Sequence, residues 1–174
     1  MLFRSGEPNT VSQILFILFN FIFAFSQMAL YSAFGNIFQS AKKSRQLRAG
    51  VVNGYISMVF IALDSLFPLD TQPTLHGLCI ILGFSLLVPT CILLGLVILE
   101  FKEFPRLIGR WFIAFGVVMI IYILWQFILT PSEDPIIENR ILASAQKIVE
   151  FFGMSMMLFA TISMRKTYRN ISQG

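Results

Sequence analysis

The sequence is poor in charged residues. Only 13% of its 174 residues are Asp, Glu, Lys or Arg, whereas 56% are hydrophobic. A soluble domain carries about 25% charged residues, so roughly half of the usual charged surface is missing. This composition excludes a soluble globule, a disordered chain and a nucleic-acid-binding domain. It predicts a small integral membrane protein.

Cysteine and histidine are also scarce, which excludes two further classes. The two cysteines, Cys79 and Cys91, lie in one apolar run. On a helix they stand about 18 Å apart, which is too far for a disulfide bond between them. The single histidine, His76, argues against a catalytic zinc site built on several histidines. The sequence therefore predicts neither a disulfide framework nor a metal or other cofactor.

Five apolar segments are long enough to cross a bilayer, which takes about 20 helical residues. They cover residues 12–34, 50–68, 75–99, 107–130 and 141–164. The fifth contains Lys147 and Glu150, so an amphipathic helix on the membrane surface is its alternative. We favour a span, because residues 151–163 are almost wholly apolar and the two charges are close enough to pair. The short connections predict an all-α fold, a single domain of five transmembrane helices over residues 1–174.

Basic residues are concentrated in alternate connections. Ten Lys and Arg residues follow the first segment, join the third to the fourth or follow the fifth, and only Arg4 and Arg140 lie on the opposite side. Because cytoplasmic loops are enriched in Lys and Arg, we expect the N-terminus outside and the C-terminus in the cytoplasm. The same basic residues would attract anionic membrane lipid.

Polar residues inside the apolar segments are the main functional indication, since ionisable side chains in hydrocarbon are costly and usually face the bundle interior. The helical rise predicts a polar cluster at the outer end of the bundle. Its expected members are Asp64, Asp70, His76, Gln126, Arg140, Lys147 and Glu150. Lys147 and Glu150 are three residues apart and share a helix face, and Asp64 is the predicted acidic partner of Lys147.

This polar cluster has several interpretations: a structural ion-pair network, a pocket for a lipid head group or small ligand, an ion path, or a catalytic site. Our hypothesis is a non-enzymatic protein that binds a lipid or small ligand, or a partner protein such as a second copy of itself. The alternative is an intramembrane hydrolase using Asp64, Asp70 and His76, or a small transporter subunit. A water-accessible funnel would favour binding or catalysis, and a dry, paired cluster would favour a structural role.

Smaller features add expectations about packing. Gly50 and Gly54 form a small-xxx-small pair that permits close helix contact. Asn20 and Gln27, seven residues apart in the first segment, are expected to hydrogen-bond within the bundle. Tyr31 is expected in an aromatic belt at the inner membrane surface.

Two short motifs resemble a known family. Residues 66–70 read Leu-Phe-Pro-Leu-Asp and residues 74–77 read Thr-Leu-His-Gly. They resemble the "FPxD" and "LHG" motifs of the prokaryotic multi-pass membrane family called domain of unknown function 998. Members often carry an acidic-Arg pair before the last helix; here Asn139 precedes Arg140, and Glu138 stands one residue earlier.

The resemblance covers about residues 51–164. It implies a multi-pass protein of the cytoplasmic membrane and carries no established activity. It also implies that Pro68, Asp70, His76 and Arg140 belong to a single feature of the outer face. Family members usually have six spans, so the resemblance implies that the first span is lacking here.

Overall fold

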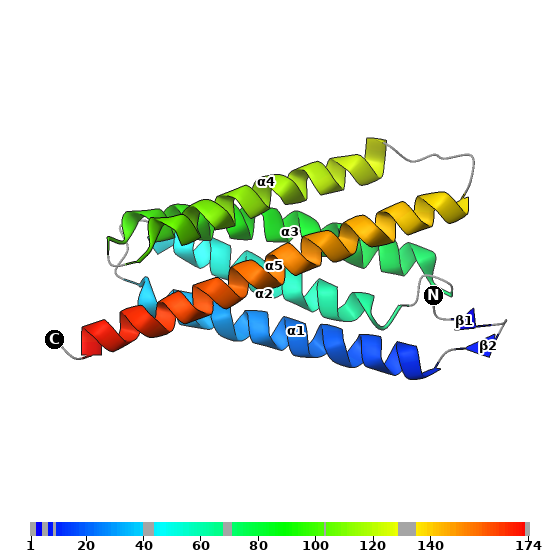
Figure 1. The fold of residues 1–174 in the computed structure, drawn as a ribbon, viewed down its shortest axis with the longest axis horizontal. Coiled ribbons are helices and arrows are strands. Elements are labelled where there is room, and N and C mark those ends of the chain that lie inside the picture. The colour runs from blue at the N-terminus through cyan, green and yellow to red at the C-terminus, as the bar shows by residue number, and fades with distance from the viewer. Residues whose placement is uncertain are drawn as a thin grey trace.

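A computed structural model describes residues 3–4, 7–8, 10–39, 44–67, 71–102, 104–128 and 135–172. Five long helices dominate the structure, and two short antiparallel strands precede them (Figure 1). In chain order the elements are β1 (Phe3–Arg4), β2 (Glu7–Pro8), α1 (Thr10–Ile37), α2 (Ser44–Asp64), α3 (Pro73–Glu100), α4 (Arg106–Ile128) and α5 (Pro135–Ser172). The strands were not predicted from the sequence.

All five helices are long and apolar enough to cross a membrane, which confirms the predicted membrane-spanning, helical architecture. The largest difference in bounds is at α5, which has 38 residues and is about 57 Å long. A hydrocarbon core is only about 30 Å thick. Among the residues of α5 whose side chains the structure describes, Lys147–Lys166 is long and apolar enough to cross it.

The helices run antiparallel in chain order, and the chain ends lie at opposite ends of the bundle (Figure 1). The most extensive packing joins α2 to α3 and α3 to α4. The last helix, α5, crosses in front of the others, packs mainly on α4 and touches α1 only slightly (Figure 1). We call the two ends of the bundle the Asp64 end, where α2 stops, and the basic end, where α2 starts and α5 stops.

The surface of α1 is apolar. Ile14, Leu18, Ile22 and Phe25 are each more than half exposed, although they belong to one of the most hydrophobic segments. A soluble monomer rarely exposes a contiguous apolar surface of this kind, whereas lipid tails cover it without cost. These side chains therefore match the membrane environment that the composition predicts.

Close helix contact at Gly50 and Gly54 is confirmed. A Cβ atom added to Gly54 would lie 2.7 Å from the Tyr31 ring, and one added to Gly50 would lie 3.1 Å from the Leu94 side chain. The ring of Tyr31 is completely buried, so its predicted place in a surface aromatic belt is wrong. Gly54 has no side chain, and Tyr31 fills the space that one would take.

Candidate ligand cavity

A polar contact closes the Asp64 end between α2 and α3. Helix α2 ends at Asp64, and His76 lies in the first turn of α3. The His76 Nδ1 atom lies 2.8 Å from Asp64 Oδ1 and 2.9 Å from the Phe67 carbonyl oxygen. The contact is an ion pair when the imidazole is protonated. Asp64 is only 5% exposed, and the contact with His76 offsets part of the free-energy cost of burying its carboxylate.

One nitrogen faces two acceptor oxygens in this arrangement. A hydrogen on Nδ1 points well at the Phe67 carbonyl oxygen, and Asp64 Oδ1 then has no aligned hydrogen-bond donor among the described residues. A buried carboxylate oxygen without a donor is unfavourable. Asp64 Oδ1 is therefore compensated by the charge of a protonated His76 but by no aligned hydrogen bond among the described residues.

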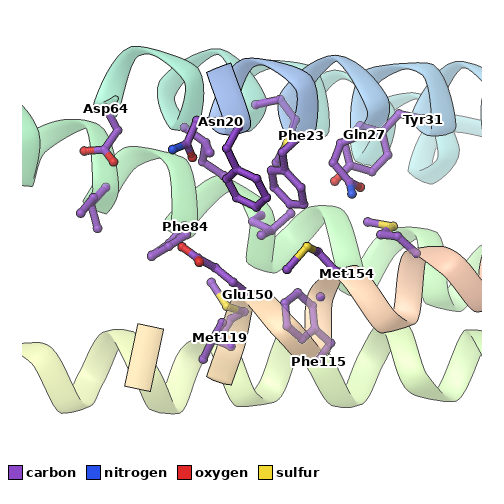
Figure 2. A pocket seen from close by; sticks show the side chains of 18 residues that line it. Asn20, Phe23, Gln27, Tyr31, Asp64, Phe84, Phe115, Met119, Glu150 and Met154 are labelled. Atoms are coloured by element: carbon purple, nitrogen blue, oxygen red, sulfur yellow. The ribbon is translucent and has the colours of Figure 1, made fainter. Parts of the chain in front are cut away.

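Below this contact, a cavity of about 50 Å³ lies inside the bundle and is lined by all five helices. Its walls are mostly Phe and Met side chains, such as Phe84, Phe115 and Met119 (Figure 2). Along α1 the lining residues run from Phe19 to Tyr31, a distance of about 18 Å along the helix axis. The cavity is therefore long and narrow. Its volume would hold about three waters in single file.

Five polar side chains line this cavity. They are Asn20, Gln27, Tyr31, Asp64 and Glu150. In Figure 2, Asn20, Gln27 and Tyr31 follow one another along α1, and Glu150 reaches in from α5.

Besides Asp64 Oδ1, two of these groups are buried without a hydrogen-bond partner among the described residues: the Gln27 Oε1 atom and the Tyr31 hydroxyl. Gln27 is 5% exposed and Tyr31 is completely buried. Leaving a buried polar atom unsatisfied costs about 1–3 kcal/mol. Asn20, by contrast, donates from Nδ2 to the Phe16 carbonyl oxygen of its own helix, at 3.0 Å. The expectation that Gln27 hydrogen-bonds within the bundle is therefore wrong for its Oε1 atom.

At the basic end the cavity is blocked by aromatic side chains. The ring of Phe34 packs edge-on against Phe112, with centroids 5.5 Å apart, and stacks on Phe38 at 5.6 Å. Phe38 also contacts Phe101 and Phe104. Both Phe34 and Phe112 are completely buried. The cavity is thus blind in this direction.

The cavity reaches the outside of the bundle between α1 and α5. Phe19 on α1 and Met154 on α5 both line it, yet they are 48% and 36% exposed. This opening follows from the limited contact between the two helices. It faces the region that lipid tails would occupy.

The predicted cluster is only partly assembled. Asp64 and Glu150 line the cavity, and His76 contacts Asp64 from α3. Asp70 and Pro68 lie outside the described residues. Gln126 and Arg140 belong to α4 and α5, but their side chains are outside the described set.

Lys147 does not join this cluster, and its predicted pairing with Asp64 is wrong. Lys147 is exposed and does not line the cavity, whereas Asp64 contacts His76 instead. The helical rise correctly predicts that Asp64 and Lys147 lie near the same end of the bundle. It gives the position of a residue along the helix axis but not the side of the helix from which its side chain projects. Glu150, three residues after Lys147, takes the inward direction.

Gln27 and Tyr31 are the site residues whose role the sequence did not indicate. Their spacing of four, after the spacing of seven from Asn20 to Gln27, places all three on one face of α1. That periodicity, in a segment otherwise made of Phe, Ile and Leu, was the available signal.

Comparisons of the chain with protein-family models, with curated proteins and with solved structures give no match. The resemblance to the family of domain of unknown function 998 therefore stays a prediction. Among the described residues, no group of three or more His, Cys, Asp or Glu is placed to hold a metal ion. Both cysteines are buried and free, as their spacing predicts.

Proposed function

We propose that this protein binds a single-chain lipid or small amphiphilic ligand inside the bundle, with the ligand's polar end among Asp64, Glu150 and Gln27. One observation carries the proposal: the cavity contains buried polar atoms, Gln27 Oε1 and the Tyr31 hydroxyl, that have no partner among the described residues. Buried polar groups in native proteins are almost always satisfied. A ligand or water in the cavity would supply the missing hydrogen bonds.

The chemistry of the cavity defines the ligand's head. Gln27 Oε1 and Asp64 Oδ1 are acceptors, so the complementary head donates hydrogen bonds, as an alcohol or a protonated amine does. The apolar walls and the narrow shape favour one unbranched tail. The opening between α1 and α5 gives access from the bilayer, so the ligand need not pass through water.

The experiment compares three amphiphiles of equal chain length: dodecanol, dodecylamine and laurate. Each is added to the delipidated protein in peptide-stabilised discs, and the melting temperature is followed. We expect dodecanol and dodecylamine to raise it and laurate to leave it unchanged. A ligand at one hundred times its dissociation constant adds about 2.7 kcal/mol of stability. If all three amphiphiles shift the melting temperature equally, or if none of them shifts it, the proposed chemistry of the ligand's head is wrong.

Gln27→Met separates binding from a structural role. It removes an unsatisfied buried amide and keeps the volume, so we expect the ligand-free protein to melt at a higher temperature and dodecanol to stabilise it less. Met58→Leu changes the same cavity wall without removing a polar group, so it should keep the dodecanol response. If Gln27→Met instead lowers the melting temperature and keeps that response, Gln27 is structural.

The transport and hydrolase alternatives have less support. The rings of Phe34, Phe38 and Phe112 block a path toward the basic end, which favours binding over passage. For hydrolysis, the hydroxyl of Ser65, the residue after Asp64, donates to the Ala62 carbonyl oxygen at 2.7 Å. It is therefore not activated by His76. Asp70, Gln126 and Arg140 stay predicted members of the polar site at the Asp64 end.

We further propose that the protein lies in the cytoplasmic membrane with its N-terminus outside. The support is the ten basic residues in alternate connections. Single cysteines at Ser132 and Ser44, in a background of Cys79→Ala and Cys91→Ala, test it. An impermeant thiol reagent should label position 132 in intact cells and position 44 only after lysis. Labelling of position 44 in intact cells would reverse the orientation.

A further inference from the structure

A second hollow lies farther along the boundary between α1 and α5, toward the basic end. It is a groove of about 600 Å³. Its walls are Ser26, Ala29, Leu30, Ala33 and Ile37 of α1 and Thr161, Met164 and Arg165 of α5. The residues of α1 that form it are mostly small, which is why the two helices leave a groove there. It is separate from the central cavity and shares none of its lining residues.

The groove walls favour an apolar occupant. The hydroxyl of Ser26 donates to the Ile22 carbonyl oxygen at 2.7 Å, and that of Thr161 donates to the Met157 carbonyl oxygen at 2.8 Å. Both hydroxyls are thus satisfied by their own helices and need no partner from an occupant. The remaining surface of the groove, apart from Arg165, is hydrocarbon.

The length and position of the groove match one leaflet of a bilayer. From Ser26 to Ile37 the helical rise is about 16 Å, roughly half of a hydrocarbon core of about 30 Å. Ile37 ends α1, and both Ile37 and Arg165 line the groove at the basic end. Because basic residues gather where helices leave the membrane, we expect the groove to start at the membrane boundary and to end near the middle.

A cationic group stands at the boundary end. Arg165 lines the groove and is exposed, and the exposed Lys166 follows it. A guanidinium binds a phosphate through two parallel hydrogen bonds. An apolar groove one leaflet deep, with a guanidinium at its mouth, is complementary to an acyl chain joined to a phosphate.

We propose that this groove is a binding site for an anionic phospholipid, with the phosphate at Arg165 and one acyl chain along Ser26, Ala29 and Ala33. The proposal does not depend on the function of the central cavity, because the two hollows have different walls and different polar groups. It assigns the lipid to the leaflet at the basic end.

The test uses native mass spectrometry of the full chain released from discs that contain equal amounts of phosphatidylglycerol and phosphatidylcholine with identical acyl chains. We expect a monomer that retains phosphatidylglycerol in preference. Arg165→Gln should lower this preference about fivefold, since one basic residue near the membrane surface contributes about that factor. Arg110→Gln is the matched control, because Arg110 is exposed at the same end of the bundle but does not line the groove.

A second variant tests the groove itself. Ala29→Phe fills it, so retention of both phospholipids should fall, while Ala114→Phe on the exposed face of α4 should leave retention unchanged. Equal effects of Arg165→Gln and Arg110→Gln would show general charge attraction and overturn the proposal. A dimer that Ala29→Phe dissociates would overturn it too, because the occupant would then be a second copy of the chain.

Discussion

The two sides of the bundle are packed in opposite ways. Between α3 and α4 the backbones touch: a Cβ atom added to Gly95 would lie 2.7 Å from the Gly109 carbonyl oxygen, and one added to Gly109 would lie 2.8 Å from the Gly95 carbonyl oxygen. Between α1 and α5 the helices separate enough to leave an opening into the cavity and the whole second groove. At these glycines α3 and α4 leave no room for an added methyl group, whereas α1 and α5 leave open space between them.

This difference assigns the two kinds of interface to two tasks. Helices in a membrane gain little from hydrophobic burial and associate through close packing and hydrogen bonds. The contacts among α2, α3 and α4 supply both, including the buried bond from Ser57 Oγ to the Gly83 carbonyl oxygen at 2.7 Å. The helix α5 is held mainly by α4. The closely packed helices therefore support the cavity, and the boundary between α1 and α5 is where we propose that a ligand enters.

The largest effect is expected where the backbones touch. Gly95→Ala places a methyl group against the Gly109 carbonyl oxygen, which is backbone and cannot rotate away. Overpacking costs about 1–3 kcal/mol and occasionally more, and we expect the upper end here. The melting temperature in detergent should fall by several degrees. Gly77→Ala is the control, because nothing lies within 4 Å of its added Cβ. An equal response of the two variants would mean that α3 and α4 do not touch.

The next effect concerns the polar contact that closes the Asp64 end. Asp64→Asn and His76→Phe should each destabilise the protein, and the double variant should lose about 1–2 kcal/mol less than the sum of the two, as for residues in direct contact. Unfolding followed by denaturant in micelles gives the three free energies. Asp64→Asn combined with Lys147→Met should be additive. If Asp64 is instead coupled to Lys147 and not to His76, the pair predicted from the sequence is correct.

These cases show how far the sequence predicts this fold. Hydropathy identifies five helices because lipid demands long apolar segments whatever their neighbours are. The glycine pair Gly50 and Gly54 indicates close contact because only a missing side chain allows it. The bounds of α5 are predicted less well. Its first turns are helical, but they are polar, so hydropathy does not detect them.

The site is harder to predict, because a cavity is what remains after all the side chains have packed. Lys147 and Glu150 have nearly the same depth, yet only Glu150 lines the cavity. The direction of each depends on how α5 is rotated against α4, and no pattern within α5 gives that rotation. His76 lies close to Asp64 because α3 starts at the end of the bundle where α2 stops (Figure 1), and the helical rise within one helix does not give this contact.

A smaller effect is expected at the buried hydroxyl of Ser57. It is completely buried, and its bond to the Gly83 carbonyl oxygen joins α2 to α3. Ser57→Ala removes the donor but leaves the carbonyl in the α3 helix, so we expect a loss of about 1 kcal/mol. The fall in melting temperature should be measurable and clearly less than for Gly95→Ala. No change at all would mean that the hydroxyl contributes nothing to the packing of α2 on α3.

The smallest effect is expected on the loose side, at Ser26. Within the part of the chain that the structure describes, its hydroxyl bonds to its own helix, at the Ile22 carbonyl oxygen, and it lines the groove. Ser26→Ala therefore breaks no contact between helices, and exposed substitutions of this kind change stability by less than about 0.5 kcal/mol. The melting temperature of the delipidated protein should match that of the parent. A loss as large as that of Ser57→Ala would show that α5 packs against Ser26 in the membrane. The groove would then be closed, and the contrast between the two sides of the bundle would disappear.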